Sequence, residues 1–457
     1  MPWKLAFAFA WMLAAAYAAN PTAELLSELI RVDTSNPPGN EAALDELIAG
    51  KLRPLGFQVS IFPTPQAGKA HLIARLKGDG SLKPVLIAAH ADVVGVEREQ
   101  WTVDPFAGLV KDGYVWGRGA IDFKGGMAVF AEAVMRLARE KVPLKRDVIF
   151  MVEADEESAP FNTTWLAQSH WAEMDCEFAL NEGGWIMKRP DGRVRYISVS
   201  TADKISIAVV LTGHGTSTHS SMPRPDNAIF RLAKALAKLS DYDTKPRLTP
   251  STREFFLTLA KTSEPPMSGY FSDLVNSKDP ATIAKADREI GTDVLLHAIM
   301  RNTIAPVLLN AGFRGNVIPS TAQATINFRA IPGTTAEDLI AEVKRVIGDS
   351  NVDVTSPQTG RTPPSESSST DTDLYRALVA SAGKVWPGAP VTPYLFPAGT
   401  DAGAWRSRGV PVYGVYPYPI SNDDLARMHG NDERVPLDSL EQGTDLIYRT
   451  LVAVAAK

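Results

Sequence analysis

The stretch Val85-Leu86-Ile87-Ala88-Ala89-His90-Ala91-Asp92 places a histidine and an aspartate directly after a run of apolar residues. An unbroken apolar run of this length is typical of a strand that is buried on both faces of a sheet. Such a strand delivers an imidazole and, two residues later, a carboxylate to its C-terminal end. One of these groups can bind a metal ion while the other orients it. A lone histidine is more often an ordinary hydrogen-bonding partner than a metal ligand. Evidence for a metal site must therefore come from other segments of the chain.

Four later segments supply residues of the same kind in comparable places. They are the tight loop Gly117-Arg118-Gly119-Ala120-Ile121-Asp122-Phe123-Lys124-Gly125-Gly126, the acidic run Asp155-Glu156-Glu157 after an apolar strand, Asn181-Glu182-Gly183-Gly184 after Phe178-Ala179-Leu180, and Met428-His429-Gly430-Asn431 before the last helix. Sites in open α/β sheets form beyond the carboxyl ends of strands, so we expect these side chains to meet at one edge. Histidines and carboxylates gathered there suit two divalent ions, and zinc fits this donor set best.

Each segment also has an ordinary structural reading when it is taken alone. The glycine-rich loop 117–126 resembles a phosphate cradle, but it lacks the Lys-Ser/Thr ending of a P-loop and the full dinucleotide spacing. The acidic run 155–157 would usually be a solvated turn. Here it follows an apolar strand, where adjacent carboxylates repel unless a cation or a shared proton relieves them. Since the ordinary reading needs five coincidences of placement, the sequence favours a metal site.

Size and composition narrow the choice of function. A chain of 457 residues is too long for one ordinary core, so two domains are expected. The net charge of −5 shows no basic excess of the kind that nucleic acids or anionic membranes attract. Cys176 is the only cysteine, which excludes a disulfide framework and a thiolate metal cluster. Any metal must therefore be held by histidines and carboxylates.

The N-terminus has the pattern of a secretory signal. Lys4 supplies the positive start, residues 5–15 are apolar, and Ala16-Tyr17-Ala18 is a small-x-small cleavage site before Ala19-Asn20. We assign residues 1–19 to a cleavable signal peptide and expect a secreted or periplasmic protein without stable membrane insertion. The alternative is an uncleaved anchor, which the shortness of the apolar stretch disfavours.

The order of predicted elements indicates an α/β protein with an insertion. Strands and helices alternate over residues 20–202 and again over 358–457, which predicts a mixed catalytic-domain sheet covered by helices. Residues 203–357 have another texture: the strands near 205–211 and 322–329 alternate between apolar and polar residues, as half-buried strands do. We expect a smaller α+β domain here, with a mainly helical insertion at about 244–302.

Together, these motifs resemble those of the M20 family of co-catalytic zinc metallopeptidases and amidohydrolases, over nearly everything after the signal. The segments that carry the resemblance are His90-Ala91-Asp92, Gly117–Asp122, Asp155-Glu156-Glu157, Asn181-Glu182-Gly183-Gly184, His429-Gly430, Asn316-Val317-Ile318-Pro319 and Asn327-Phe328-Arg329-Ala330-Ile331-Pro332-Gly333. The Glu-Gly-Gly version and the helical insertion are most similar to the carboxypeptidase S and N-acyl-amino-acid hydrolase branch. The resemblance implies that the inserted domain is a lid of the dimerisation type.

The resemblance implies a role for each catalytic-domain residue. Asp122 would bridge two zinc ions, with a cis peptide bond between Asp122 and Phe123. The remaining assignments are His90 and Glu182 as the ligands that complete one site, Glu157 and His429 as those of the other, Asp92 as the residue that orients His90, and Glu156 as the general base. Cobalt or manganese would accept the same ligands.

On the lid, the resemblance implies that His219 steadies the oxyanion. The nearby His214 is a second candidate, and the His-Ser-Ser-x-Pro match favours His219. The resemblance leaves open whether His219 acts in its own subunit or in a partner's. The implied substrate contacts are Asn316, Arg329, Gly399, Thr400 and Asp401. An arginine that many family members carry just after this aspartate is absent, which leaves Arg329 as the stronger candidate for carboxylate recognition.

The expected function is therefore a di-zinc hydrolase that cleaves amide bonds of peptides, as a C-terminal exopeptidase, or of N-acyl amino acids, using a metal-bridged water and a glutamate base. The sequence does not separate peptidase from acylase, because both act beside a free carboxylate. Expected partners are a small peptide or N-acyl amino acid substrate and a second copy of the chain in a homodimer. The alternative is a catalytically silent protein that binds small molecules or peptides on the same fold, which the presence of every ligand and of Glu156 disfavours.

Overall fold

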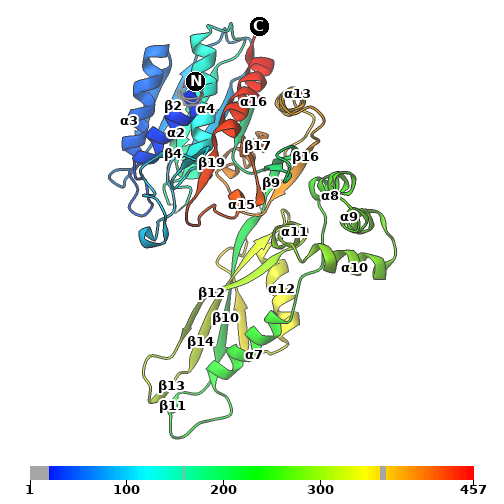
Figure 1. Cartoon of the computed structure of the whole chain (residues 1–457). Helices are drawn as coiled ribbons and strands as arrows, with labels where there is room; N and C mark the ends of the chain where they lie inside the picture. The colour runs from blue at the N-terminus through cyan, green and yellow to red at the C-terminus, as the bar shows by residue number, and fades with distance from the viewer. Residues whose placement is uncertain (1–19, 158–159, 361–366) are drawn as a thin grey trace, which may run out of the picture. The chain divides into compact units, whose positions relative to one another are not determined.

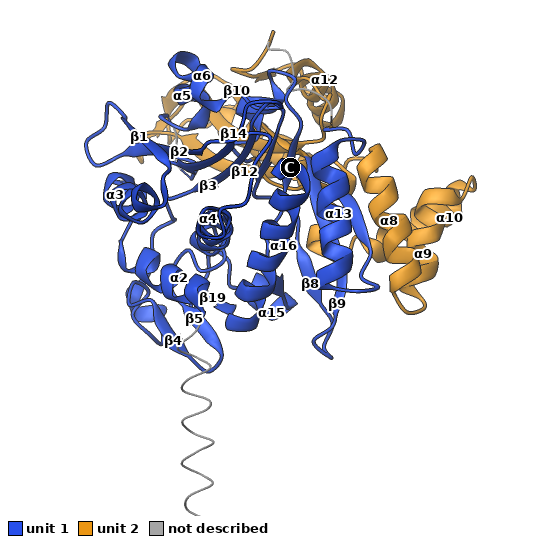
Figure 2. Ribbon diagram, turned by 90° about the horizontal axis from the view of Figure 1, so that it is seen from above, with its two compact units in different colours: residues 1–201, 368–393, 400–457 blue, residues 202–367, 394–399 orange. Residues whose placement is uncertain are grey.

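A computed structural model describes residues 20–157, 160–360 and 367–457. The chain forms two compact units (Figures 1 and 2). Unit 1 comprises Met1–Thr201, Ser368–Pro393 and Thr400–Lys457, and unit 2 comprises Ala202–Ser367 and Tyr394–Gly399. The signal peptide expected at residues 1–19 lies outside the described residues. Among the helices that are described, none combines the length and the apolar character needed to cross a bilayer.

Unit 1 is built around a mixed sheet with the strand order β1-β2-β6-β3-β7-β17-β9-β8-β18, in which β16 also pairs with β9. Its strands are β1 (Gln58–Pro63), β2 (Ala70–Leu76), β3 (Val85–His90), β6 (Val148–Glu153), β7 (Phe178–Asn181), β8 (Ile186–Lys188), β9 (Val194–Asp203), β16 (Val391–Phe396), β17 (Val412–Gly414) and β18 (Pro419–Ile420). The central strand β3 is fully buried, as its apolar run predicts, and it is parallel to both β6 and β7. The α/β fold class predicted for this part is confirmed.

Helices cover both faces of this sheet (Figure 2). Helix α4 packs against β3 and β6 on one face, with α2 and α16 beside it. On the other face, Leu86 and Ala88 of β3 share a core with Leu166 of α5 and Trp405 of α14. The helices of unit 1 are α2 (Pro21–Arg31), α3 (Glu41–Leu52), α4 (Lys124–Arg139), α5 (Thr163–Ser169), α6 (Trp171–Met174), α13 (Asp373–Val385), α14 (Gly403–Arg406), α15 (Asn422–Leu425) and α16 (Leu437–Ala455), with short 3-10 helices at Arg53–Leu55 and Arg98–Gln100.

A small three-stranded sheet in unit 1 brings two distant loops together. It contains β4 (Leu109–Lys111), β5 (Tyr114–Trp116) and β19 (Arg434–Pro436). The glycine-rich loop starts directly after β5, and the loop that contains His429 ends directly before β19. Since β5 and β19 pair antiparallel, the two loops leave this sheet at the same end.

Unit 2 contains a four-stranded antiparallel sheet in the order β12-β14-β10-β15, together with the two-stranded pair β11 and β13. Its strands are β10 (Ile205–His214), β11 (Thr218–His219), β12 (Thr303–Ala311), β13 (Val317–Ile318), β14 (Thr321–Ala330) and β15 (Val352–Thr355). Burial alternates along β10 and β14 as expected, because one face of the sheet packs on α7 (Ala228–Ser240) and α12 (Ala336–Ile347).

The helical insertion of unit 2 consists of α8 (Pro250–Thr262), α9 (Met267–Asn276), α10 (Pro280–Ile290) and α11 (Val294–Met300). Proline or an aspartate or threonine cap marks three of these helix starts, which is why the segment reads as helical. The edge strand β12 follows directly and was not predicted. It contains Pro306, and a register shift occurs between Pro306 and Leu308, so its pattern is not that of a regular strand.

Candidate metal centre

Three parallel strands deliver the candidate ligands to one edge of the unit 1 sheet. His90 is the last residue of β3, the acidic run 155–157 follows β6, and Glu182 follows β7 directly. His90 pairs in register with Glu153, the last residue of β6. Because the strands are parallel, their carboxyl ends and the residues beyond them meet at the same edge.

His90, Asp122 and Glu182 form the first group of candidate ligands. His90 Nε2 lies 3.1 Å from Asp122 Oδ1 and 3.5 Å from Glu182 Oε2. All three side chains are buried, and their potential ligand atoms lie within 4.8 Å of one another. His90 Nδ1 lies 2.9 Å from the main-chain oxygen of Asp92, which leaves Nε2 free to face the carboxylates.

Asp122, Glu157 and His429 form the second group. His429 Nε2 lies 3.0 Å from Asp122 Oδ2 and 3.0 Å from Glu157 Oε1. The two oxygens of Asp122 therefore face different histidines, one in each group. The peptide bond between Asp122 and Phe123 is cis, as the family resemblance implied.

The glycines after Asp122 allow its loop to close on helix α4. A Cβ at Gly126 would lie 2.1 Å from the Phe123 ring, and one at Gly125 would lie 2.2 Å from the carbonyl oxygen of Ala120. Neither position has room for a side chain, so glycine is required for this close approach. The loop thus holds Asp122 immediately before the N-terminus of α4.

Glu156 lies beside the first group and Asp92 supports it from behind. Potential ligand atoms of His90, Glu156 and Glu157 lie within 4.8 Å of one another. The carboxylate of Asp92 accepts hydrogen bonds from the backbone nitrogen of Glu156 at 3.2 Å and from that of Glu157 at 3.0 Å. Asp92 therefore anchors the turn that carries Glu156 through its carboxylate and the His90 ring through its main-chain oxygen.

The electrostatics of the cluster match a site for cations. Burial, reinforced by the charge of Asp122 and opposed by His90, raises the pKa of Glu182 to about 7. Burial and the charge of Glu182 also raise the pKa of Glu156 well above its ordinary value. Hydrogen bonds to Asp122 and Glu157 raise the pKa of His429 to about 10. Buried carboxylates that repel one another beside two histidines form a donor set that divalent cations stabilise, so the residues fit two metal ions.

Three residues that the sequence analysis did not assign complete the cluster. The hydroxyl of Tyr416 lies 3.1 Å from Asp122 Oδ1 and 2.9 Å from Glu182 Oε2. The buried Glu433 accepts hydrogen bonds from Arg118 Nη1 and from the backbone nitrogen of Asp122. Arg118 Nη2 in turn donates to the carbonyl oxygen of His429 at 3.2 Å. The only sequence signal for Glu433 is its place four residues after His429.

In unit 2, the structure brings together two pairs of the residues that were predicted to act on the substrate. His219 is exposed and its Nδ1 lies 2.8 Å from Ser221 Oγ, while β11 and β13 pair His219 with Val317, next to Asn316. Arg329 is exposed on β14, and a Cβ at Gly399 would lie 3.8 Å from its Nη1.

The remaining predicted contacts, Thr400 and Asp401, belong to unit 1. Asp401 is only 4 % exposed, and its carboxylate accepts a hydrogen bond from Thr163 at 2.9 Å. The same hydroxyl lies 3.0 Å from Glu153 Oε1. Burial raises the pKa of Asp401 to about 7, so this side chain is part of a buried acid pair rather than of an open surface.

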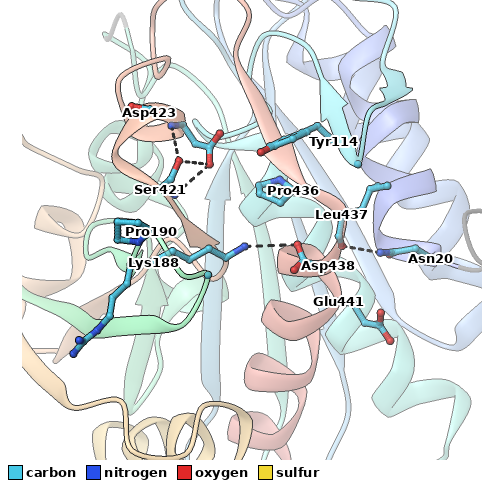
Figure 3. A pocket seen from close by; sticks show the side chains of 14 residues that line it. Asn20, Tyr114, Lys188, Pro190, Ser421, Asp423, Pro436, Leu437, Asp438 and Glu441 are labelled. Atoms are coloured by element: carbon cyan, nitrogen blue, oxygen red, sulfur yellow. Dashed lines mark hydrogen bonds and ion pairs between the residues drawn. The ribbon is translucent and has the colours of Figure 1, made fainter.

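A separate cavity of about 740 Å³ in unit 1 contains none of these residues (Figure 3). Lys188 in its wall forms an ion pair with Asp438 at 3.7 Å and donates to Ser439 Oγ at 2.9 Å, and the Asn20 side chain donates to the carbonyl oxygen of Leu437. Lys188 and Asp438 in this wall thus pair with each other, in contrast to the crowded carboxylates of the metal centre.

An α/β sheet with histidines and carboxylates gathered at the carboxyl ends of its strands is the arrangement expected of a metal-dependent hydrolase. Residues 86–453 match the model of peptidase family M20/M25/M40, and the chain belongs to this family as a metallopeptidase or amidohydrolase. It is 33% identical over 388 residues to "Probable carboxypeptidase S-like 2" of Dictyostelium discoideum (83% of this chain, 73% of the relative). It is 29% identical to the human "N-fatty-acyl-amino acid synthase/hydrolase PM20D1" (84% and 76%). Its fold is similar to that of an M20 family metallo-carboxypeptidase of Sulfolobus solfataricus (TM-score 0.69, 19% identity, 94% and 98% covered).

Proposed function

We propose that this chain is a two-zinc hydrolase that cleaves the amide bond beside a free carboxylate, in N-acyl amino acids or at the C-terminus of small peptides. The observation that carries the proposal is the Asp122 carboxylate, whose oxygens lie 3.1 Å from His90 Nε2 and 3.0 Å from His429 Nε2. The names of the two sequence relatives, a carboxypeptidase and an N-fatty-acyl-amino acid synthase/hydrolase, describe this kind of bond.

Five side chains would hold the ions. His90, Glu182 and one oxygen of Asp122 would bind one ion, and Glu157, His429 and the other oxygen would bind the second. When bound, two such metal ions supply Lewis acidity, and they lower the pKa of a water molecule bound to them to about 7. Cobalt or manganese suits the same donors, so the native metal is decided by availability as well as by geometry.

Glu156 is the proton carrier in this proposal. It lies partly buried beside Glu157 and His90, and burial together with the charge of Glu182 raises the pKa of its carboxyl group well above the ordinary range, which favours uptake of a proton. It accepts the proton of the attacking water and passes it to the leaving amine. No serine or cysteine nucleophile is required for this reaction.

Two exposed residues of unit 2 are proposed to act on the substrate. The His219 ring is a donor for the oxygen that becomes negative during attack, and one such donor is typically worth about 2.7–4 kcal/mol. The Arg329 guanidinium can bind the free carboxylate through two hydrogen bonds. Asn316, Gly399 and Thr400 are the further proposed substrate contacts.

The experiment that tests the function is a hydrolysis screen of dipeptides against long-chain N-acyl amino acids, with and without a chelator. We expect release of a free amino acid from at least one class, loss of that activity with chelator and recovery with zinc. Binding of fewer than two zinc ions per chain after saturation would contradict the two-metal proposal. Absence of hydrolysis in both substrate classes would contradict the function itself.

We also propose that the protein is exported and dimeric. The N-terminal pattern of Lys4 and residues 5–18 supports export, and mass spectrometry of the secreted protein should find a start at Ala19 or Asn20. The edge strand β12 supports a homodimer, since Val307, Leu308 and Leu309 are 55 %, 67 % and 68 % exposed. An exposed apolar edge strand is a template for pairing with a second chain.

A further inference from the structure

A second polar cluster lies behind the turn that carries Glu156 and Glu157. We call it the Lys69 cluster, and its members are Asn36, Glu41, Lys69, Asp92 and Asp155. Each of them is at most 7 % exposed. None is among the proposed metal ligands, and only Asp92 has been given a role above.

Two carboxylates of the cluster hold the turn through its backbone. Asp92 accepts hydrogen bonds from the nitrogen atoms of Glu156 and Glu157, and Asp155 Oδ2 accepts one from the nitrogen of Phe161 at 3.0 Å. Asp155 itself has a φ of +61°, in the left-handed region that is unfavourable for a residue with a side chain. The turn therefore depends on these contacts to keep its shape.

Asn36 and Lys69 tie the two carboxylates together. Asn36 Nδ2 donates to Asp92 Oδ2 at 2.9 Å and to Asp155 Oδ1 at 2.8 Å. Lys69 Nζ donates to Asn36 Oδ1 at 2.7 Å and also to Asp155 Oδ1. The ammonium thus fixes the orientation of the Asn36 amide, whose nitrogen then faces both acids.

The charges of the cluster explain why a cation is needed there. Potential ligand atoms of Glu41, Asp92 and Asp155 lie within 4.8 Å of one another, and neither oxygen of Glu41 has a hydrogen-bond partner among the residues that the structure describes. Buried carboxylates at this separation repel one another strongly. The Lys69 ammonium contacts Asp155 and so supplies the positive charge that these carboxylates need. The acidic group therefore needs no metal ion of its own.

We propose that Lys69 is a positioning residue of the metal centre. Acting through Asn36, Asp92 and Asp155, its ammonium holds the 155–157 turn in place before any metal binds, so that Glu157 is preformed as a ligand. The further consequence that Glu156 is preformed as a proton acceptor rests on the function proposed above.

The test compares three full-length variants in metal-free and zinc-loaded form. Lys69→Met keeps the length of the side chain without its charge, Lys69→Arg keeps the charge, and Arg146→Met is the matched control. Arg146 is an equally buried cation, 2 % exposed and bonded to Glu177, but it lies two residues before β6 rather than beyond its carboxyl end. The readouts are amide hydrogen exchange of Glu156 and Glu157 without metal, zinc retention against a chelator, and kcat and KM.

In Lys69→Met we expect these two amides to exchange at least about tenfold faster, with β3 unchanged, and zinc affinity to fall about 10–100-fold, the usual effect of a lost supporting contact. We expect kcat to fall while KM stays near that of the wild type, and Lys69→Arg to restore part of each change. In Arg146→Met, the amides of Glu156 and Glu157 should exchange at the wild-type rate when that rate is compared with the rates of β3.

Two results would overturn the proposal. One is wild-type exchange and zinc retention in Lys69→Met, and the other is faster exchange that is equal in the turn and in β3, because that would indicate a merely structural role. If Lys69→Met does not fold, Asn36→Ala removes the next link and is judged by the same criteria. The exchange rates decide the role of Lys69 even if the wild type hydrolyses none of the screened amides, in which case only the proposed function fails.

Discussion

The carboxylate of Glu433 holds the backbone of Asp122 from a position 311 residues later in the chain, with 3.0 Å between Glu433 Oε1 and the Asp122 nitrogen. The same oxygen accepts a hydrogen bond from Ile121 at 2.7 Å, while Oε2 accepts from Gly119 and from Arg118. Since Asp122 faces both candidate histidines, Glu433 supports the one carboxylate that the two halves of the centre share.

Glu433→Gln should weaken metal binding and destabilise the fold. Glutamine replaces one accepting oxygen with a donor that faces other donors, and it leaves the buried Arg118 guanidinium without its charge partner. Breaking a buried ion pair on one side typically costs about 3–5 kcal/mol. Zinc titration should show an affinity about 10–100-fold lower, and urea unfolding should report the stability loss.

The matched control is Glu177→Gln, which removes the partner of another buried arginine, Arg146, from a carboxylate that is 41 % exposed. Water can replace this partner more readily, so we expect a smaller loss of stability and an unchanged zinc affinity. Equal zinc affinities in Glu433→Gln and wild type would refute the supporting role.

Glu156→Gln should separate metal binding from catalysis. The amide keeps the shape of the side chain but cannot accept a proton at neutral pH, and a positioned general base typically contributes 10²–10⁴-fold to the rate. We expect the wild-type zinc content, measured by metal analysis, and a loss of turnover of at least that order. Retained activity would mean that another group is the base.

The sequence was most informative for candidate ligands that lie at the end of a predicted strand or directly after it. The apolar run 85–89 predicts a buried strand, and it thereby predicts where His90 emerges; the same reasoning applies to Glu182 after β7. The contacts of Tyr416 and Glu433 were not predictable in this way. Tyr416 reaches the centre only because β17 pairs parallel with β7, and a tyrosine between Val415 and Pro417 reads as an ordinary core residue.

Tyr416→Phe should weaken the centre without disturbing its packing. The Tyr416 ring is stacked on Trp185 at 4.3 Å and meets the Phe123 ring edge-on at 5.1 Å, and phenylalanine preserves both contacts. Only the hydroxyl next to Asp122 and Glu182 is lost. We expect zinc to be released to a chelator several-fold faster, with a change in melting temperature of a few degrees at most. Release at the wild-type rate would show that this hydroxyl does not act on the ligands.

Glu41→Gln should make stability less dependent on pH. Burial raises the pKa of Glu41 from 4.5 to about 7, so the folded chain keeps a proton that the unfolded chain loses as the pH rises through this window. The contribution of Glu41 to stability is therefore present at low pH and is lost between about pH 4.5 and 7. At pH 8 the variant should be more stable than the wild type by up to about 3 kcal/mol, and at pH 4 the difference should vanish.

Urea unfolding of zinc-loaded protein across this pH range measures that difference. Glu46→Gln is the control, since Glu46 lies on the same helix but is 66 % exposed and pairs with Arg53 at the surface. Its difference from the wild type should stay within about 0.5 kcal/mol at every pH. If the free energies of unfolding of Glu41→Gln and the wild type change in parallel from pH 4 to 8, the pKa of Glu41 is not raised in the folded chain.

Leu309→Lys should dissociate the proposed homodimer. Leu309 is 68 % exposed on β12, which is the edge of the unit 2 sheet, and a lysine on an edge strand opposes pairing with a second strand. We expect light scattering to report a dimer for the wild type and a monomer for the variant, with the same far-UV spectrum. Val294→Lys is the control, because Val294 is 83 % exposed on the helix α11 rather than on the edge strand, and this variant should stay dimeric. A wild type that is monomeric at micromolar concentration, or a Leu309→Lys variant that remains a dimer, would exclude β12 as the interface.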